Sequence, residues 1–363
     1  MKILFFVFSF FLITNNARAQ RTPAKEKISV IAYYSGNEKS INAYPIEKLT
    51  HIIFSFCHLK GNQLSVDDHR DTLTIRQLVA LKKRNKALKV LLSLGGWGGC
   101  ETCSMAFSTE EGRAEFSQSV KRLNQYFKTD GIDLDWEYPA IAGYPGHRYD
   151  VADKHNFTLL VSSLRKALGS KHEISFAAGG FTTFLAEAIE WDKVTPMVDN
   201  INIMSYDLVH GGSKITGHHT PLYSTSMQIE STDHAVKFLD SVGVPKSKMV
   251  IGAAFYARIF DVDENTNNGL YQPGKFSKGL PYMRFNKDSL QQEGFNYYWD
   301  EEAKAPYMYS SAKKQLITYD DETSMTLKTR YAMSENLKGI MFWQLGNDKV
   351  TNGLLSAIHN ALH

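Results

Sequence analysis

Three acidic residues alternate with apolar residues in the short segment DGIDLDWEYP, which starts at Asp130. Successive side chains of a β-strand point to opposite faces, so Asp133, Asp135 and Glu137 would share one face at spacings of about 7 Å. Like charges this close in a poorly solvated place cannot all ionise, and at least one carboxyl pKa should rise. A carboxylic acid that stays protonated near neutral pH can donate a proton to a departing group. The pattern therefore predicts general acid catalysis.

Two other interpretations of the acidic row compete with catalysis. An edge strand with a solvated acidic face would show the same alternation, but the neighbouring predicted strands have the continuous apolar pattern of buried parallel strands. A calcium loop of the EF-hand type needs glycine at its sixth position. That glycine is absent here, and also in the later acidic segment DVDENTNNG from Asp261. The catalytic interpretation is therefore favoured.

The residues around this segment alternate between predicted strands and amphipathic helical patterns. The predicted strands begin at Ile28, His51, Lys89, Gly131, Glu173, Asn200, Met249 and Gly339. The clearest predicted helices cover 72–86, 110–127, 153–168, 232–242 and 323–334. Such repetition is typical of an α/β fold of the (β/α)8 TIM barrel type, in which the carboxylates would point inward near the C-terminal end of their strand. A doubly wound open sheet is the alternative, but no glycine-rich phosphate loop follows the first strand.

One interval breaks this alternation. Residues 258–320, between the seventh and eighth predicted strands, are rich in Tyr, Asn, Gly and Pro and show no long helical period. A loop of this length inside a compact domain usually carries structure or function. We interpret it as a small inserted α+β subdomain beside the active-site face of a single catalytic barrel, which is predicted to span residues 20–363.

Residues 1–19 have the pattern of a cleavable export signal. Lys2 precedes a mostly apolar run that ends at Ile13, and Ala17-Arg18-Ala19 fits a signal peptidase site. The run is shorter than the roughly 20 apolar residues of a membrane-spanning helix, and no later segment is long enough. The mature protein is therefore expected to be soluble and secreted or periplasmic, with no membrane partner. The formal net charge is only +3, without basic blocks, so no nucleic-acid partner is predicted.

The cysteines and histidines do not have the spacing of a metal site. Cys100 and Cys103 form a CxxC pair, but zinc needs four ligands and no second pair exists. In an exported protein this pair, or one of its members with Cys57, is expected to form a disulfide, and the sequence leaves the pairing open. His218 and His219 are interpreted as loop residues. No metal and no cofactor are predicted.

The acidic segment resembles the DxxDxDxE signature of the glycoside hydrolase family 18 chitinases. Other segments resemble that family in the same order: IAYY (31–34), SLGGW (93–97), MSYD (204–207), TGHHTPLY (216–223), FYAR (255–258) and GIMFW (339–343). FYAR departs from the family's YGR motif, because Ala257 stands where glycine is usual. The resemblance covers nearly the whole mature chain. It implies a TIM barrel that hydrolyses β-1,4-linked N-acetylglucosamine chains, and it argues against the solvated edge strand.

The resemblance implies a retaining mechanism in which the substrate's own 2-acetamido group is the nucleophile and an oxazolinium-like intermediate forms. Glu137 would protonate the departing glycosidic oxygen and later activate water. Asp135 would hold the acetamido N–H and exchange charge with Asp133 behind it. Tyr206 would donate its hydroxyl to the acetamido carbonyl. These four residues form the predicted catalytic set.

The remaining motif residues are predicted to bind substrate. Trp343 would form the floor under the distorted sugar, and Trp97 a stacking platform further along the cleft. Arg258 would hydrogen-bond a sugar hydroxyl. The predicted substrate-binding set is Tyr33, Ser93, Gly96, Trp97, Tyr138, Met204, Asp207, Arg258 and Trp343. Within this set, Tyr33 and Ser93 are expected to hydrogen-bond behind the carboxylates.

The leading hypothesis is a secreted, monomeric chitinase that cleaves chitin or N-acetylglucosamine oligosaccharides internally, with the insertion raising one wall of the cleft. An endo-β-N-acetylglucosaminidase acting on glycoprotein or cell-wall glycans would use the same acidic strand. A chitin-binding lectin-like relative would lack the acid at the last motif position, whereas Glu137 is present.

Overall fold

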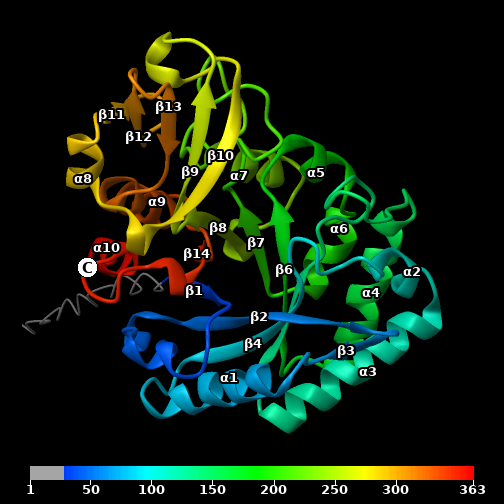
Figure 1. The fold of residues 1–363 in the computed structure, drawn as a ribbon. Helices are drawn as coiled ribbons and strands as arrows, with labels where there is room; N and C mark the ends of the chain where they lie inside the picture. The colour runs from blue at the N-terminus through cyan, green and yellow to red at the C-terminus, as the bar shows by residue number, and fades with distance from the viewer. Residues whose placement is uncertain (1–27) are drawn as a thin grey trace, which may run out of the picture.

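The computed structural model describes residues 28–363, so the predicted export signal and its cleavage site lie outside the described residues. Within this range, parallel strands follow one another in the order β1-β14-β8-β7-β6-β5-β4-β2, and a pairing between β1 and β2 closes the barrel (Figure 1). The barrel strands are β1 (Ser29–Tyr34), β2 (His51–Lys60), β4 (Lys89–Gly95), β5 (Gly131–Asp135), β6 (Glu173–Gly179), β7 (Asn200–Met204), β8 (Met249–Ala254) and β14 (Gly339–Trp343). The predicted (β/α)8 barrel is confirmed, and a short β3 (Gln63–Ser65) pairs with β2 outside it.

Helices surround the strands (Figure 1). They are α1 (His69–Ala80), α2 (Cys103–Phe107), α3 (Glu110–Phe127), α4 (Asp153–Leu168), α5 (Thr182–Glu187), α6 (Trp191–Val194), α7 (Thr232–Ser241), α9 (Glu322–Ser334) and α10 (Leu354–Ala361). Side-chain caps fix where several of them begin. The hydroxyl of Thr109 accepts a hydrogen bond from the N–H of Gly112 at 3.0 Å, and the hydroxyl of Ser231 accepts one from the N–H of His234 at 3.0 Å.

The face of β5 that carries no charge packs outward against the helices. Ile132 and Leu134 are buried in the main hydrophobic core. The ring of Trp136, just beyond the strand, lies 5.5 Å from that of Phe107 on α2 and 6.3 Å from that of Phe157 on α4, measured between centroids. Because strand side chains alternate, this packing directs the two aspartates of β5 into the barrel.

A second, antiparallel sheet is inserted between β8 and β14, where the sequence predicts an α+β insertion (Figure 1). Its strand order is β10-β9-β13-β12-β11, and it has its own apolar cluster of Val262, Leu270, Tyr307, Tyr309 and Leu316. The elements are β9 (Tyr256–Val262), β10 (Gly274–Pro281), α8 (Lys287–Gln292), β11 (Asn296–Asp300), β12 (Ala305–Ser310) and β13 (Gln315–Thr318). Because β9 starts directly after β8, the sheet rises from the C-terminal end of the barrel, where the predicted site lies.

The structure decides the cysteine pairing that the sequence leaves open. Cys100 and Cys103 form a disulfide, and Cys57 is a free thiol buried in the main core. Among residues 28–363, no helix has both the length and the apolar character that crossing a membrane requires.

A partly buried charge cluster at the opposite, N-terminal end of the barrel supports a stability prediction. Glu173 lies 3.0 Å from Nε2 of His51 and also pairs with Lys89. Burial alone would raise the pKa of Glu173, but the hydrogen bonds and charges of His51 and Lys89 outweigh it and lower the pKa to about 2. A carboxyl whose pKa is depressed by folding contributes stability above its unfolded pKa, and that contribution is lost as the pH falls toward 2.

Glu173→Gln is therefore expected to lower the free energy of unfolding by about 1–3 kcal/mol at neutral pH. The difference from the wild type should shrink between about pH 4.5 and pH 2, where the wild-type carboxyl becomes protonated. Urea unfolding at several pH values measures this, with Glu111→Gln on the exposed start of α3 as the control. A deficit that stays constant down to pH 2.5 would contradict the assignment.

Candidate active site

Asp133 is fully buried at the centre of the barrel, and four donors from four other strands, β1, β4, β6 and β7, hold its carboxylate. These donors are the hydroxyls of Tyr33 (3.0 Å), Ser93 (2.8 Å) and Ser175 (2.6 Å) and the side-chain amide of Asn202 (3.1 Å). Burial raises the pKa of Asp133, while the four hydrogen bonds favour its charged form. Tyr33 and Ser93 are also fully buried, so both are placed to orient Asp133 from behind.

Asp135 and Glu137 follow Asp133 on the same face. Asp135 is 4% exposed, and its carboxyl shares a hydrogen bond with that of the half-buried Glu137. Apart from this carboxyl contact, the buried Oδ1 of Asp135 has no hydrogen-bond partner among the described residues. Burial, followed by the charges of Glu137 and Asp133, raises the pKa of Asp135 well above its usual range. The pair therefore has a proton to share and an acceptor that is free to receive an N–H.

The pKa of Glu137 is raised to about 7, mainly by burial and further by the charge of Asp207. A general acid must be protonated to act, so kcat/KM for a glycoside substrate is expected to fall as the pH rises above about 7. Asp207→Asn removes a charge that raises this pKa, and the alkaline limb should then move to lower pH. Initial rates between pH 5 and 9 with a chromogenic N-acetylglucosamine dimer measure both effects. An alkaline limb centred below pH 5.5, or one that Asp207→Asn leaves in place, would contradict the argument.

Tyr206 and Asp207 lie just after β7, beyond Ser205, at the same end of the barrel. Among residues 28–363, the hydroxyl of Tyr206 contacts only a weak acceptor, Sδ of Met341 at 3.8 Å, and burial raises the pKa of this tyrosine well above its usual value. Tyr206 is therefore a neutral O–H donor whose proton is available to a ligand. Its ring makes an edge-to-face contact with Tyr256, with centroids 6.3 Å apart.

Asp207 is paired with two basic side chains. The guanidinium of Arg258 bonds both of its carboxyl oxygens, and Nδ1 of His219 lies 3.4 Å from Oδ1. Burial would raise the pKa of Asp207, but His219 and Arg258 outweigh it and hold the pKa well below the usual range. The guanidinium of Arg258, which is predicted to hydrogen-bond a sugar hydroxyl, thus keeps a charged carboxylate beside Tyr206.

Trp343 ends β14 and forms part of an aromatic floor. Its ring is stacked on that of Phe56, with centroids 5.5 Å apart and planes at 14°, and it lies 5.9 Å from the ring of Tyr33. Gly96 lies beneath this stack. Its φ is +80°, and a Cβ at this position would come within 2.3 Å of the Phe56 ring. Gly96 is thus placed to admit the aromatic floor, and a direct substrate contact is not needed to account for it.

A second aromatic group surrounds Trp97. Trp97 is 58% exposed, and its ring lies 6.5 Å from that of Tyr138 and 5.6 Å from that of Tyr144. Met204 and Tyr138 line the apolar cluster inside the barrel together with the half-buried Trp343. An exposed aromatic plane near a charged site is a typical surface for stacking a sugar ring.

Several residues of this constellation were not predicted from the sequence. Ser175 and Asn202 face the barrel interior from β6 and β7, and their alternation within apolar strands was the available signal. Phe56 and Tyr256 gave no signal, because aromatic residues on strands are most often core. His219 lies in the loop after β7, as predicted, and the sequence did not show that it is fully buried against Asp207. Within residues 28–363 no group of three or more His, Cys, Asp or Glu side chains is arranged to hold a metal ion.

The sequence is similar to known proteins over most of its length. The family model described as glycosyl hydrolases family 18 matches residues 29–348. Chitinase A1 of Niallia circulans is 35% identical over 300 residues, which cover 76% of this chain and 43% of that protein. An oviduct-specific glycoprotein of Mus musculus is 30% identical over 332 residues, covering 85% of this chain and 45% of that protein. The chain thus spans less than half the length of these two relatives.

The structure is also similar to solved structures. One is a glycoside hydrolase family 18 N-acetylglucosaminidase from Paenibacillus barengoltzii, with 35% identity, a TM-score of 0.82 and coverage of 92% of this chain and 99% of that chain. Another is a Group IV chitinase of Ostrinia furnacalis in complex with allosamidin, with 26% identity, a TM-score of 0.84 and coverage of 93% and 99%. These similarities extend over the barrel and the inserted sheet together.

Proposed function

The chain belongs to glycosyl hydrolase family 18, and on this premise we propose that it is a glycoside hydrolase that cleaves β-1,4-linked N-acetylglucosamine chains. The observation that carries the proposal is the inward row of carboxyls. Glu137 has a pKa of about 7, and it shares a hydrogen bond with an Asp135 that has a free, buried acceptor oxygen. This arrangement supports proton donation together with recognition of an acetamido N–H. A lectin-like protein would have no use for such a raised pKa at Glu137.

In the proposed first step, the acetamido carbonyl oxygen of the substrate attacks the anomeric carbon. The bond to the departing oxygen breaks at the same time, and that oxygen takes the proton of Glu137. The positive charge of the resulting oxazolinium is balanced by Asp135, which accepts its N–H, while Tyr206 donates its hydroxyl to the carbonyl oxygen before attack. In the second step, water gives a proton to the Glu137 carboxylate and adds to the anomeric carbon. The product regains its acetamido group with retained configuration.

We further propose that the substrate is an extended polymer. The inserted sheet rises beside the strand ends that carry Tyr206 and Asp207, and the exposed Trp97 offers a stacking surface beside Tyr138, the neighbour of Glu137 in the chain. A wall of this kind and an exposed aromatic platform would bind several sugars at once, which favours cleavage within a chain. A second candidate is supported by the similar structure from Paenibacillus barengoltzii, which is described as an N-acetylglucosaminidase.

The proposal is tested with N-acetylglucosamine hexamer and the purified protein, following products and anomers with time. An internally cleaving chitinase should release dimers, trimers and tetramers whose new reducing ends are initially β-anomers. Release of single sugars from the start would favour the second candidate, and α-anomers would contradict the proposed retaining mechanism. If the hexamer stays intact, a high-mannose glycopeptide is the next substrate, because an endo-β-N-acetylglucosaminidase would cleave its core.

The cellular setting and the domain organisation are also proposals. We propose that residues 1–19 direct export, and that residues 20–363 act as one monomeric catalytic barrel with residues 258–320 as a subdomain. Mass spectrometry of the exported protein checks whether its N-terminus is Gln20. Light scattering of the purified protein checks the mass of a monomer. An uncut N-terminus or a stable dimer would overturn the corresponding part.

A further inference from the structure

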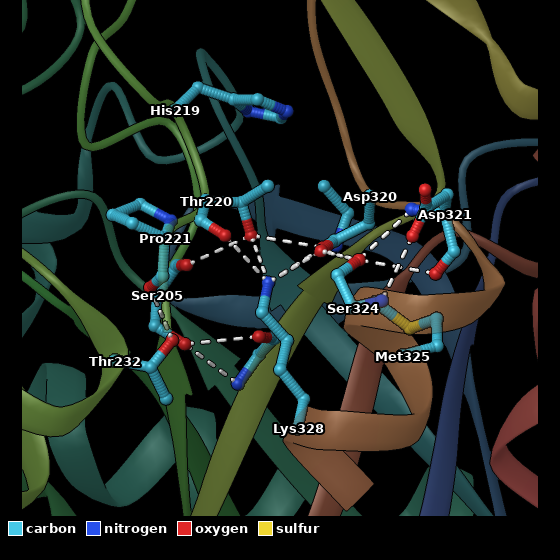
Figure 2. Close-up of polar contacts among 12 residues, drawn as sticks. Ser205, His219, Thr220, Pro221, Thr232, Asp320, Asp321, Ser324, Met325 and Lys328 are labelled. Atoms are coloured by element: carbon cyan, nitrogen blue, oxygen red, sulfur yellow. Dashed lines mark hydrogen bonds and ion pairs between the residues drawn. The ribbon is translucent and has the colours of Figure 1, made fainter. Parts of the chain in front are cut away.

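Lys328 is a fully buried lysine outside the candidate active site, on α9. Its Nζ donates to the two carboxyl oxygens of Asp320, at 2.8 and 2.7 Å, and to the hydroxyl and the carbonyl oxygen of Thr220, at 2.6 and 2.7 Å (Figure 2). Asp320 and Thr220 are each only 1% exposed. A buried ion pair gains little stability over apolar residues of the same volume, so stability alone does not account for this arrangement.

The network joins three segments that meet at the C-terminal end of the barrel. Asp320 follows β13, at the point where the chain leaves the inserted sheet. Its Oδ2 accepts the N–H of Ala254, the last residue of β8, at 3.1 Å, and its Oδ1 accepts the hydroxyl of Ser324 on α9 at 2.7 Å. The hydroxyl of Thr220, in the loop after β7, lies 3.1 Å from Oδ2 of Asp320 and 3.3 Å from the carbonyl oxygen of Ser205. Figure 2 shows Lys328 extending from α9 toward Thr220 in the loop and Asp320 in the segment before the helix.

The anchored residues are direct neighbours of active-site residues in the chain. Ser205 precedes Tyr206 and Asp207, and Thr220 follows His219, which lies against Asp207. We infer that the network of Lys328, Asp320 and Thr220 is a positioning device, which fixes the two backbone segments that hold Tyr206 and Asp207 against His219. The inference deepens the proposed function and rests on it, since it concerns the geometry of that same site. None of the three residues would touch substrate.

The hydroxyl of Thr220 allows the inference to be separated from a packing role. Thr220→Val keeps the shape of the side chain and removes the hydroxyl, whereas Thr220→Ser keeps the hydroxyl and removes the methyl group. If the network positions the site, the valine variant should lose about 10-fold in kcat, while its KM stays within about 3-fold of the wild type. Misplaced reacting groups slow the chemical step, but they weaken the binding of sugars further along the cleft much less. The serine variant should keep kcat within about 2-fold, although the lost methyl group lowers its Tm.

The opposite ranking, an equal loss in both variants, or no loss in the valine variant would overturn the inference. A readout that is independent of turnover separates this result from failure of the proposed function. The ring nitrogens of His219 can be observed by NMR in ¹⁵N-histidine-labelled protein, with the signal assigned by its absence in His219→Gln. If the wild type hydrolyses no tested glycan, the proposed function fails. A His219 signal that shifts in Thr220→Val and not in Thr220→Ser would still support the positioning role, and an unshifted signal would overturn it.

A second variant guards against a folding defect. Asp320→Asn combined with Lys328→Met removes both buried charges together, which avoids leaving one of them unpaired. We expect this double variant to keep a Tm close to that of the wild type and to lose about 10-fold in kcat, because Thr220 loses its ammonium partner. The matched control is Glu173→Gln at the other end of the barrel, which should lower Tm and leave kcat unchanged. A double variant with both wild-type Tm and wild-type kcat would overturn the inference.

Discussion

Replacing Glu137 by glutamine is expected to lower kcat on N-acetylglucosamine hexamer by about 10²- to 10⁴-fold, the range over which a general acid contributes. Glutamine keeps the size of the side chain and can still donate a hydrogen bond, but it has no proton to transfer at neutral pH. The half-buried carboxyl with its pKa of about 7 is the group in the barrel suited to protonate the departing oxygen. Among the described residues, Glu137 is the side chain that is hydrogen-bonded to the carboxyl of Asp135.

The decisive comparison is between turnover and binding. Isothermal titration of the Glu137→Gln variant with the hexamer should give a Kd within about 3-fold of that inferred for the wild type, since most of the sugar contacts are untouched. Glu111→Gln, on the exposed start of α3, controls for a general effect of removing a glutamate. Retention of more than a tenth of the wild-type kcat would show that another group delivers the proton. Loss of binding together with turnover would show that the site had been disrupted.

Replacing Asp135 by asparagine is expected to lower kcat by about 10²- to 10³-fold, the usual effect of removing one preorganised group that stabilises charge in a transition state. Asp135 is 4% exposed, so its charge acts where water screens it little. The oxazolinium that it would face carries a positive charge and an N–H. Asparagine carries no negative charge to balance the oxazolinium. Its amide N–H can also face the N–H of the intermediate, and two donors cannot form a hydrogen bond.

A charged analogue of the intermediate distinguishes this role from a general loss of structure. A protonated thiazoline derived from N-acetylglucosamine resembles the oxazolinium, and its affinity should fall by about 10- to 100-fold in the asparagine variant. Affinity for the neutral hexamer should change by less than about 3-fold, and the Tm should stay close to that of the wild type or rise, because one buried like charge is gone. Equal losses of affinity for both ligands would contradict the proposed electrostatic role.

The sequence by itself determined the face on which the acids lie and the class of fold. Alternation in the segment around Asp133 has a period of two, which only a strand converts into one charged face and one apolar face. Continuous apolar strands separated by amphipathic helices then indicate a parallel sheet with both faces covered, and eight such repeats favour a closed barrel. Both inferences depend on local periodicity, and the barrel and the ends of α3 and α4 agree with them.

The partners of each charge were decided only by the tertiary structure. Asp133 receives hydrogen bonds from Tyr33, Ser175 and Asn202, which lie 100, 42 and 69 residues away. Which residues meet across a barrel depends on the register of strands that are not neighbours in sequence, and no local pattern contains that register. The pairing of Arg258 with Asp207 has the same origin, because it depends on how the inserted sheet joins the barrel.

Lys328 shows most clearly the difference between what the sequence predicts and what the tertiary structure decides. Lys328 lies in a sequence window that predicts an ordinary amphipathic helix, where a lysine is expected in solvent. Its full burial against Asp320 and Thr220 follows from three segments that meet only after the inserted sheet returns to the barrel. A side chain's surroundings are a property of packed elements, whereas its secondary structure is largely a property of its neighbours in the chain. The surroundings of Lys328 therefore required the tertiary structure, whereas its place in a helix could be predicted from the sequence.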